Sequence, residues 1–242
     1  MNGKVKKQHY VPQFYLNNFS SNNKGGIYVY DKQNGKEFTC NIDSIACERY
    51  FYDITTDIDS NGTNKQTVEK GLGKLESYVS GSIKSVLHKA TTASRWYLEN
   101  CYSMSMEEWC NIITFTSVQL CRTRGFREEL VNMLEGDVSK ALLSKLCLLK
   151  GRDIKPEDLD IKVDPLTEQI RFLVNSWAKF GEVMESHLCI VWINRTNTPF
   201  WTSDTPVVRR GADNGWALDA YGTNIFYPIG PNICIGFHER RY

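Results

Sequence analysis

The chain has 242 residues, of which 41% are hydrophobic and 24% charged, so it is long enough to bury a full-sized core. Its net charge of +1 excludes binding driven by a strong overall charge, although a local basic groove is compatible with that sum. It contains no apolar run long enough for a transmembrane helix, no secretory signal pattern and, among its eight cysteines, no metal-finger spacing. We therefore expect one domain over residues 1–242, in the cytoplasm, with reduced thiols and no membrane partner.

The first segment, QHYVPQFYLNNFS at residues 8–20, is rich in aromatic residues. Chain termini are usually frayed and polar, so this composition predicts a buried segment. Alternating bulky and polar residues on both sides of QNGK predict a hairpin that pairs residues 27–30 with residues 37–40. Asn34 and Gly35 are typical of a tight turn with positive φ angles. RYFYDI, at residues 49–54, predicts a third strand, and a polar loop follows it.

From about Thr67 the hydrophobic period changes from two to 3.6, which predicts helices. The first begins there. The second opens with a capping box of Ser105 and Glu108 and runs on towards residue 136. The third covers residues 137–150, with Gly151 as its stop, and the fourth covers residues 166–186. The middle section, at about residues 67–187, is thus predicted to be a bundle of about four helices.

The C-terminal section returns to a strand pattern. LCIVWIN, at residues 188–194, is apolar enough for a central strand, and PFWTSDTPVV predicts a strand that breaks into a turn. NIFYPIG and NICIGFHE complete a meander. Strand patterns at both ends with helices between them predict an α+β fold. We expect the N-terminal hairpin and the C-terminal meander to join in one sheet.

Two carboxylates lie on the apolar stripe of the first predicted helix. Glu69, Leu72, Glu76, Val79 and Ile83 follow one another at spacings of three and four residues. A buried carboxylate takes a proton, pairs with a cation or coordinates a metal. One interpretation is structural, with Glu69 favouring the helix dipole and Glu76 meeting an arginine. The other is a functional site.

Other polar residues also stand in apolar contexts. Gln119 lies on the apolar stripe of the second helix, and Arg122 follows one turn later. Each can tie helices together or contact a ligand, and Arg122 can pair with Glu76 or bind a phosphate. Asp204 can cap its own turn or reach into a cleft, and His9 can be a satisfied core residue or a site residue. His187, near a helix end, is expected at the surface.

Several segments together carry a family resemblance: QHYVPQFYLNNFS, IYVYD, ACERYFY, EKGLGKLE, VQLCRTR, FWTSDTPVV and FYPIGP. With them the chain resembles the domain-of-unknown-function family DUF4238, from Lys7 to about Gly236. The resemblance implies a bacterial, accessory protein in a defence setting, and it names no reaction. The positions that it implies for the family's motifs are His9, Pro12, Glu48, Glu69, Glu76, Gln119, Arg122, Ser203, Asp204 and Pro206.

We expect one cleft to bring together His9, Glu76, Gln119, Arg122 and Asp204, with Glu69 at its edge. The sequence lacks a nucleophile elbow, a phosphate-binding loop and a dinucleotide fingerprint, so no organic cofactor is predicted. Carboxylates with a histidine favour Mg²⁺ or Mn²⁺, which predicts metal ligands at Glu69, Glu76 and Asp204. Arg122 would then stabilise a phosphoryl charge, and His9 would act as general acid or base.

These roles predict a metal-dependent phosphodiesterase, most simply a nuclease, with nucleic acid or a nucleotide as its partner. The alternative is a non-catalytic binding or sensor module, in which the same polar residues line a pocket for a small anion, a nucleotide or a protein partner. A third interpretation is a structural network that joins the N-terminal segment to the helices. A homo-oligomer is compatible with each of them.

Overall fold

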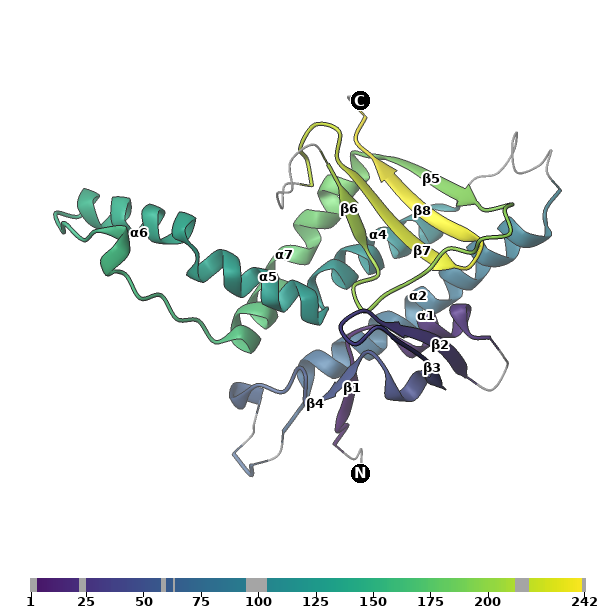
Figure 1. Ribbon diagram of the computed structural model, residues 1–242, viewed down its shortest axis with the longest axis horizontal. Helices are drawn as coiled ribbons and strands as arrows, with labels where there is room; N and C mark the ends of the chain where they lie inside the picture. The colour runs from purple at the N-terminus through teal and green to yellow at the C-terminus, as the bar shows by residue number, and fades with distance from the viewer. Residues whose placement is uncertain are drawn as a thin grey trace.

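The computed structural model describes residues 4–21, 25–57, 60–62, 64–94, 104–211 and 218–240. It has the predicted α+β class (Figure 1). Its α-helices are α1 (Gln13–Leu16), α2 (Thr67–Thr92), α4 (Met106–Cys121), α5 (Arg124–Glu135), α6 (Asp137–Leu149) and α7 (Pro165–Glu185). Its strands are β1 (Lys7–His9), β2 (Gly26–Asp31), β3 (Lys36–Asn41), β4 (Cys47–Arg49), β5 (Leu188–Ile193), β6 (Val208–Arg210), β7 (Asn224–Gly230) and β8 (Ile233–His238).

The described strands form three antiparallel sheets. These are β1–β4, the hairpin β2–β3 and a four-stranded sheet in the order β5–β8–β7–β6. The predicted hairpin and meander are both present, but they lie in different sheets, so the expectation of one shared sheet is wrong. The N-terminal segment finds a partner close by in the sequence instead, because β4 lies beside β1 with His9 opposite Cys47.

The hairpin has the predicted register, with Ile27 opposite Cys40 and Tyr30 opposite Glu37. Its turn differs from the prediction. The loop Lys32–Gly35 connects the paired residues Asp31 and Lys36, and only Gly35 in this loop has a positive φ, of 62°. The Asp31 carboxylate accepts hydrogen bonds from the backbone of the next residues and thereby closes the longer loop.

Three further strand predictions need correction. The strand expected in RYFYDI is replaced by β4, which lies earlier in the chain and ends at Arg49. It ends there because Tyr50 turns the backbone to a positive φ of 57°. The apolar strand β5 lies at the edge of its sheet, not at the centre. PFWTSDTPVV contributes only Val208 to a strand, because the residues before it make turns and side-chain bonds in place of a ladder.

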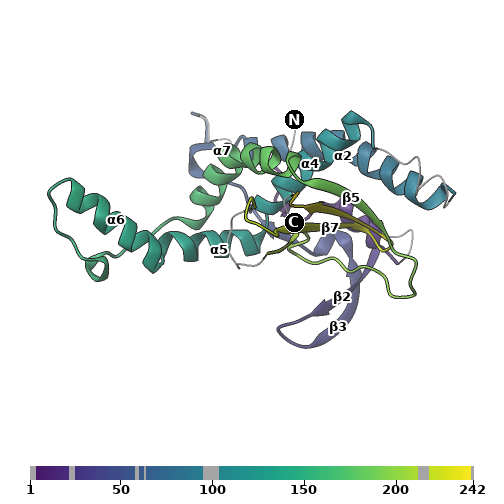
Figure 2. The same ribbon diagram turned by 90° about the horizontal axis from the view of Figure 1, so that it is seen from above.

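The helices cover one face of the C-terminal sheet. α2, α4 and α7 lie side by side in a layer over it, as Figure 2 shows from above. Aromatic contacts join the layers, with Trp109 on α4 6.2 Å from Phe237 and Phe115 5.9 Å from Tyr227, measured between ring centroids. The N-terminal segment, helices and meander all contribute to one cluster of buried hydrophobic side chains.

The predicted second helix is interrupted. Ser105 and Glu108 form the expected capping box at its start, but α4 ends at Cys121. Thr123 then caps a new helix, α5, by accepting a hydrogen bond from Phe126 N at 3.2 Å. The break places Arg122 at the junction of the two helices, where its side chain is directed into the core.

Candidate functional site

Arg122 is the centre of the polar cluster. Its side chain is 1% exposed, and it donates hydrogen bonds from all three of its guanidinium nitrogens. Nη1 contacts Glu76 Oε1 at 2.9 Å, Nη2 the carbonyl oxygen of His9 at 2.7 Å, and Nε the Tyr52 hydroxyl at 3.3 Å. Such a buried charge is tolerated because each guanidinium nitrogen has a partner and Glu76 supplies the opposite charge.

Gln119 lies one turn before Arg122 on the same side of α4. Its Nε2 donates to the carbonyl oxygen of Tyr10 at 2.9 Å. Arg122 and Gln119 therefore bind two successive carbonyls of the N-terminal segment. Within the described ranges nothing hydrogen-bonds to Gln119 Oε1, although this atom is buried. Both residues act here as ties between helix and segment, which is the structural interpretation of their sequence context.

Two carboxylates of α2 lie near this arginine. The Glu76 side chain is 26% exposed and forms the ion pair with Arg122. The pKa of Glu69 is raised to about 7, first by burial and to a smaller extent by the charges of Glu76 and Asp53, while the charge of Arg122 opposes the rise. Glu69 makes no direct hydrogen bond in the part of the chain that the structure describes. The prediction that both carboxylates share a helix face with buried residues is confirmed.

His9 is close to these groups but half-buried. Its backbone carbonyl, not its ring, contacts Arg122. The ring nitrogens lie 3.3 and 3.4 Å from Gln13 Nε2. Burial lowers the pKa of His9, while nearby carbonyl groups and the charge of Glu76 work in the opposite direction. The imidazole is therefore mainly neutral at pH 7.

Asp204 lies outside the hydrogen-bonded network of Arg122. It is exposed in the turn where Ser203 Oγ donates to the Thr205 carbonyl at 2.9 Å. No hydrogen bond or ion pair joins it to His9, Glu76, Gln119 or Arg122 among the described residues. Its charge is felt by Tyr10, whose pKa is raised to about 12, first by burial and then by Asp204 and Glu48.

The predicted metal ligands do not form a ready-made site. Across the described ranges, no group of three His, Cys, Asp or Glu side chains lies close enough to hold a metal ion. The sequence places all three carboxylates in unusual contexts, but it does not show on which side of the N-terminal segment each one lies.

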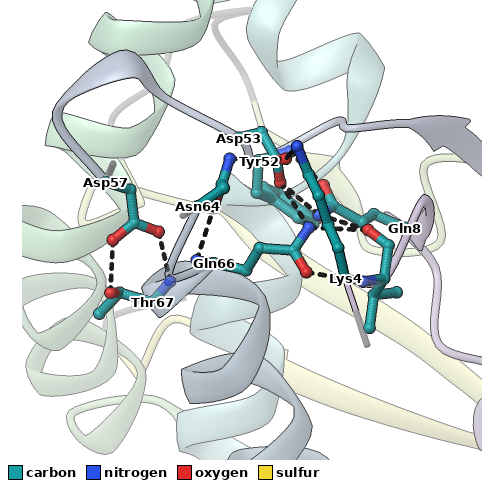
Figure 3. A network of polar contacts seen from close by, with 9 residues as sticks. Lys4, Gln8, Tyr52, Asp53, Asp57, Asn64, Gln66 and Thr67 are labelled. Atoms are coloured by element: carbon teal, nitrogen blue, oxygen red, sulfur yellow. Dashed lines mark hydrogen bonds and ion pairs between the residues drawn. The ribbon is translucent and has the colours of Figure 1, made fainter. Parts of the chain in front are cut away.

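A second polar network was not predicted (Figure 3). Buried Gln8 donates to Asp53 Oδ1 at 2.6 Å and accepts from the backbone nitrogen of Tyr52 at 2.6 Å. Gln66, which precedes α2 in a left-handed conformation, also donates to Asp53 Oδ1 and exchanges two bonds with the Val5 backbone. Apart from Gln8 in β1, these residues lie in loops, where periodicity gives no signal. The only sequence signal was that Gln8 begins the opening aromatic segment.

His187 also corrects a prediction, because it is buried and not at the surface. Its Nδ1 lies 2.8 Å from the Val183 carbonyl, and within the described chain its Nε2 has no partner. It lines a hollow of about 380 Å³ together with Met104, Met106, Trp109, Cys189 and Arg240. None of the five predicted site residues lines this hollow.

Comparison with known proteins gives one match. The sequence model of DUF4238, described as a protein of unknown function, matches residues 7–240. No curated protein and no solved structure matches the chain. Among the described residues, no helix is long and apolar enough to cross a membrane.

Proposed function

Because the chain belongs to the DUF4238 family, whose description assigns no reaction, we propose a function from its own side chains. It is a hydrolase that cleaves phosphodiesters, with Glu69 and Glu76 as its reacting carboxylates. The observation that carries the proposal is their pairing on one face of α2 beside Arg122. Two carboxylates in different electrostatic environments can divide the roles of acid and base.

The two glutamates differ in the way that such chemistry needs. Glu76 is held by a buried guanidinium, which fixes the position of its carboxylate. Glu69 has a pKa of about 7, so it is partly protonated at neutral pH and suits a general acid or base. His9, whose pKa is lowered by burial, supplies a neutral imidazole nearby. Arg122 is buried and each of its guanidinium nitrogens already has a partner, so its role becomes the positioning of Glu76 and not contact with a phosphate.

Mg²⁺ or Mn²⁺ fits this proposal as a weakly held partner. Mg²⁺ often binds proteins through one or two carboxylates and keeps several waters, with substrate phosphates completing its shell. Glu69 and Glu76 supply that number of carboxylates. Asp204 is left out of the proposed ligand set because, among the described residues, no group of three potential ligands lies close enough together to hold a metal ion. We choose a phosphodiester as the substrate because its phosphate oxygens can complete the coordination shell of such a metal ion.

The test is a cleavage assay with purified protein on single-stranded DNA, double-stranded DNA and RNA, with Mg²⁺, with Mn²⁺ and with a chelator. We expect metal-dependent cleavage that falls at least about a hundredfold in Glu69→Gln and Glu76→Gln, as the loss of acid–base catalysis implies. Glu128→Gln, an exposed carboxylate on α5, is the matched control. Absence of cleavage on every substrate, or full activity in both variants, would overturn the proposal.

A second candidate function is the binding of a small anionic ligand without catalysis. The observation that favours it is the hollow lined by His187, Trp109 and Arg240, in which His187 Nε2 is a buried acceptor without a partner. Thermal-shift measurements with a panel of mononucleotides and inorganic phosphate test this candidate. A rise in melting temperature that is lost in His187→Phe and retained in Glu69→Gln would place binding at this hollow.

A further inference from the structure

The turn that carries Asp204 lies against the start of α5. A methyl group on Gly125 would lie 2.7 Å from Thr205 Oγ1, which shows how closely the turn and the helix approach each other (Figure 1). On α5 itself, Arg124 Nη1 lies 3.7 Å from Glu48 Oε1 on β4. Glu48 and Asp204 are positions that the family resemblance singles out, and both lie on this part of the molecule. The proposed hydrolase uses neither of them.

Tyr10 connects these two segments. It follows β1 directly, and its backbone nitrogen donates to the Ala46 carbonyl at 3.0 Å, next to β4. After burial, the charges of Asp204 and Glu48 do most to raise its pKa, so its hydroxyl lies near both carboxylates. Tyr10 is only 8% exposed, yet within the described chain its hydroxyl has no hydrogen-bond partner. Buried polar groups are nearly always bonded, so an unpaired hydroxyl among charged side chains indicates a place for a ligand.

The carboxylates around this hydroxyl lack close cationic partners. Asp204 forms no ion pair or hydrogen bond with any described residue, and Glu48 has only the long contact with Arg124. Arg124 is held instead by Glu128, whose Oε1 lies 2.9 Å from its Nε. The guanidinium of Arg127 is turned into the protein, where its Nε and Nη2 both donate hydrogen bonds. Three carboxylates thus meet two guanidinium groups that are already bonded, and the local field favours a cationic ligand.

We propose that Tyr10, Glu48 and Asp204 bind the cationic N–H group of a small amine or guanidine. The two carboxylates accept charge-assisted hydrogen bonds from this group, and the oxygen of the Tyr10 hydroxyl accepts a further one. A metal ion fits less well, because no group of three potential ligands lies close enough together in the described part of the chain. The site includes neither Glu69 nor Glu76, so binding here does not depend on the proposed hydrolase activity.

The first test compares small cations by ligand-observed nuclear magnetic resonance at one low ionic strength. n-Butylammonium and n-butylguanidinium carry N–H donors, and tetramethylammonium carries the same charge without them. We expect saturable binding of at least one N–H ligand, and the tighter of the two identifies the class of ligand. Tetramethylammonium should bind at least about tenfold more weakly, because it cannot form a charge-assisted hydrogen bond. Failure of both N–H ligands to bind, or equal binding of all the cations, would overturn the proposal.

The second test locates the binding on these side chains. Glu48→Gln and Asp204→Asn should each weaken it at least about tenfold, because each removes a charged acceptor. Tyr10→Phe should weaken it about threefold and leave the melting temperature unchanged, since the hydroxyl has no partner to lose among the described residues. Glu185→Gln, at an exposed position at the end of α7, is the matched control and should bind as the wild type does. Unchanged affinity in both charge variants, or an equal loss in Glu185→Gln, would contradict the proposal.

Discussion

Arg122 illustrates how one residue can look functional in the sequence and structural in the fold. Removing a guanidinium from water costs several kcal/mol unless its donors are all bonded. Here Glu76 supplies charge, His9 supplies a carbonyl and Tyr52 supplies a hydroxyl. The planar fork of arginine reaches these three directions at once, which a lysine cannot do. Arg122 thereby joins α4, α2 and the N-terminal segment.

Arg122→Met should therefore destabilise the protein by about 3–5 kcal/mol, because it leaves a carboxylate and a buried carbonyl without their partner. Denaturant unfolding followed by circular dichroism measures this change. Arg171→Met is the matched control, since Arg171 forms an exposed pair with Glu168 on α7, and it should cost less than about 1 kcal/mol. Equal losses in the two variants would contradict the structural role.

The raised pKa of Glu69 predicts a pH dependence of stability. Its pKa is about 7 in the folded protein and near 4.5 as an ordinary carboxyl. Between these values the folded state binds more protons than the unfolded state, so this group's contribution to stability is present below pH 4.5 and is lost as pH rises to 7. Glu69→Gln should remove that decline.

The measurement is the free energy of unfolding of wild type and Glu69→Gln at several pH values from 4 to 8. The free energy of unfolding of Glu69→Gln should rise relative to that of the wild type as the pH increases through the range in which Glu69 titrates. Both proteins contain the same other titrating groups, so the contributions of these groups to the free energy of unfolding cancel in the comparison. Glu128→Gln, at an exposed position on α5, controls for removing any carboxylate. A constant difference at all pH values would show that Glu69 has an ordinary pKa.

At the scale of elements, the start of α5 packs closely against the turn that carries Asp204. A methyl group on Gly125 would meet Thr205 Oγ1 at 2.7 Å, which is too short for a real contact. The turn is also held internally by Ser203, which bonds to the Thr205 backbone in both directions. The turn therefore cannot move aside without losing its own bonds.

Gly125→Ala should cost about 1–3 kcal/mol, the usual penalty for forcing an extra methyl group into a packed contact. Thr205→Ala in the same chain should recover most of that loss, because it removes the atom in the way. Gly73→Ala is the control. Nothing lies within 4 Å of a methyl group there, so it should stabilise α2 by about 0.5–1 kcal/mol. Chemical denaturation of the wild type and the three variants measures all of these effects.

Elements with a strong period were predictable, and the breaks between them were not. α2, α6 and α7 begin within a residue of their predicted starts, because apolar spacing and caps agree there. The break at Arg122 was missed because apolar residues continue in helical spacing across it. β5 was predicted as a central strand because its sequence is an apolar run. Such a run does not show whether the strand is buried by neighbouring strands on both sides or by helices that cover the sheet.

At the scale of the whole molecule, the sequence showed which polar residues were out of place but not how they group. His9, Glu76, Gln119 and Arg122 gather because the N-terminal segment crosses α2 and α4. Asp204 lies near Tyr10 instead. β1 ends at His9 and the chain bends at Tyr10, so the ring of His9 meets Gln13 while the ring of Tyr10 packs on Phe51. Which neighbours each residue meets depends on the path of the segment through the fold. Hydrophobic periodicity in the sequence carries no information about that path.

The N-terminal segment connects the layers of the molecule. Tyr15 donates to the Pro228 carbonyl at 2.6 Å and stacks on Tyr227, and the segment's carbonyls bind Gln119 and Arg122 on α4. Its predicted burial is confirmed by the buried side chains of Gln8, Val11 and Tyr15. Removing residues 1–16 would expose the core and leave buried donors unpaired, so the shortened chain should lose its cooperative thermal transition.

The matched deletion removes a segment from α6 instead. Glu135 Oε1 accepts a hydrogen bond from Val163 N at 3.0 Å, so residues 136–162 can be replaced by a short Gly-Ser linker between adjacent ends. Because α6 has no buried side chain, this chain should keep a melting temperature close to that of the wild type. Differential scanning calorimetry compares the two deletions. A cooperative transition in the chain without residues 1–16 would show that the helices and the meander hold together without the segment, and Arg122 and Gln119 would then have to be satisfied by water.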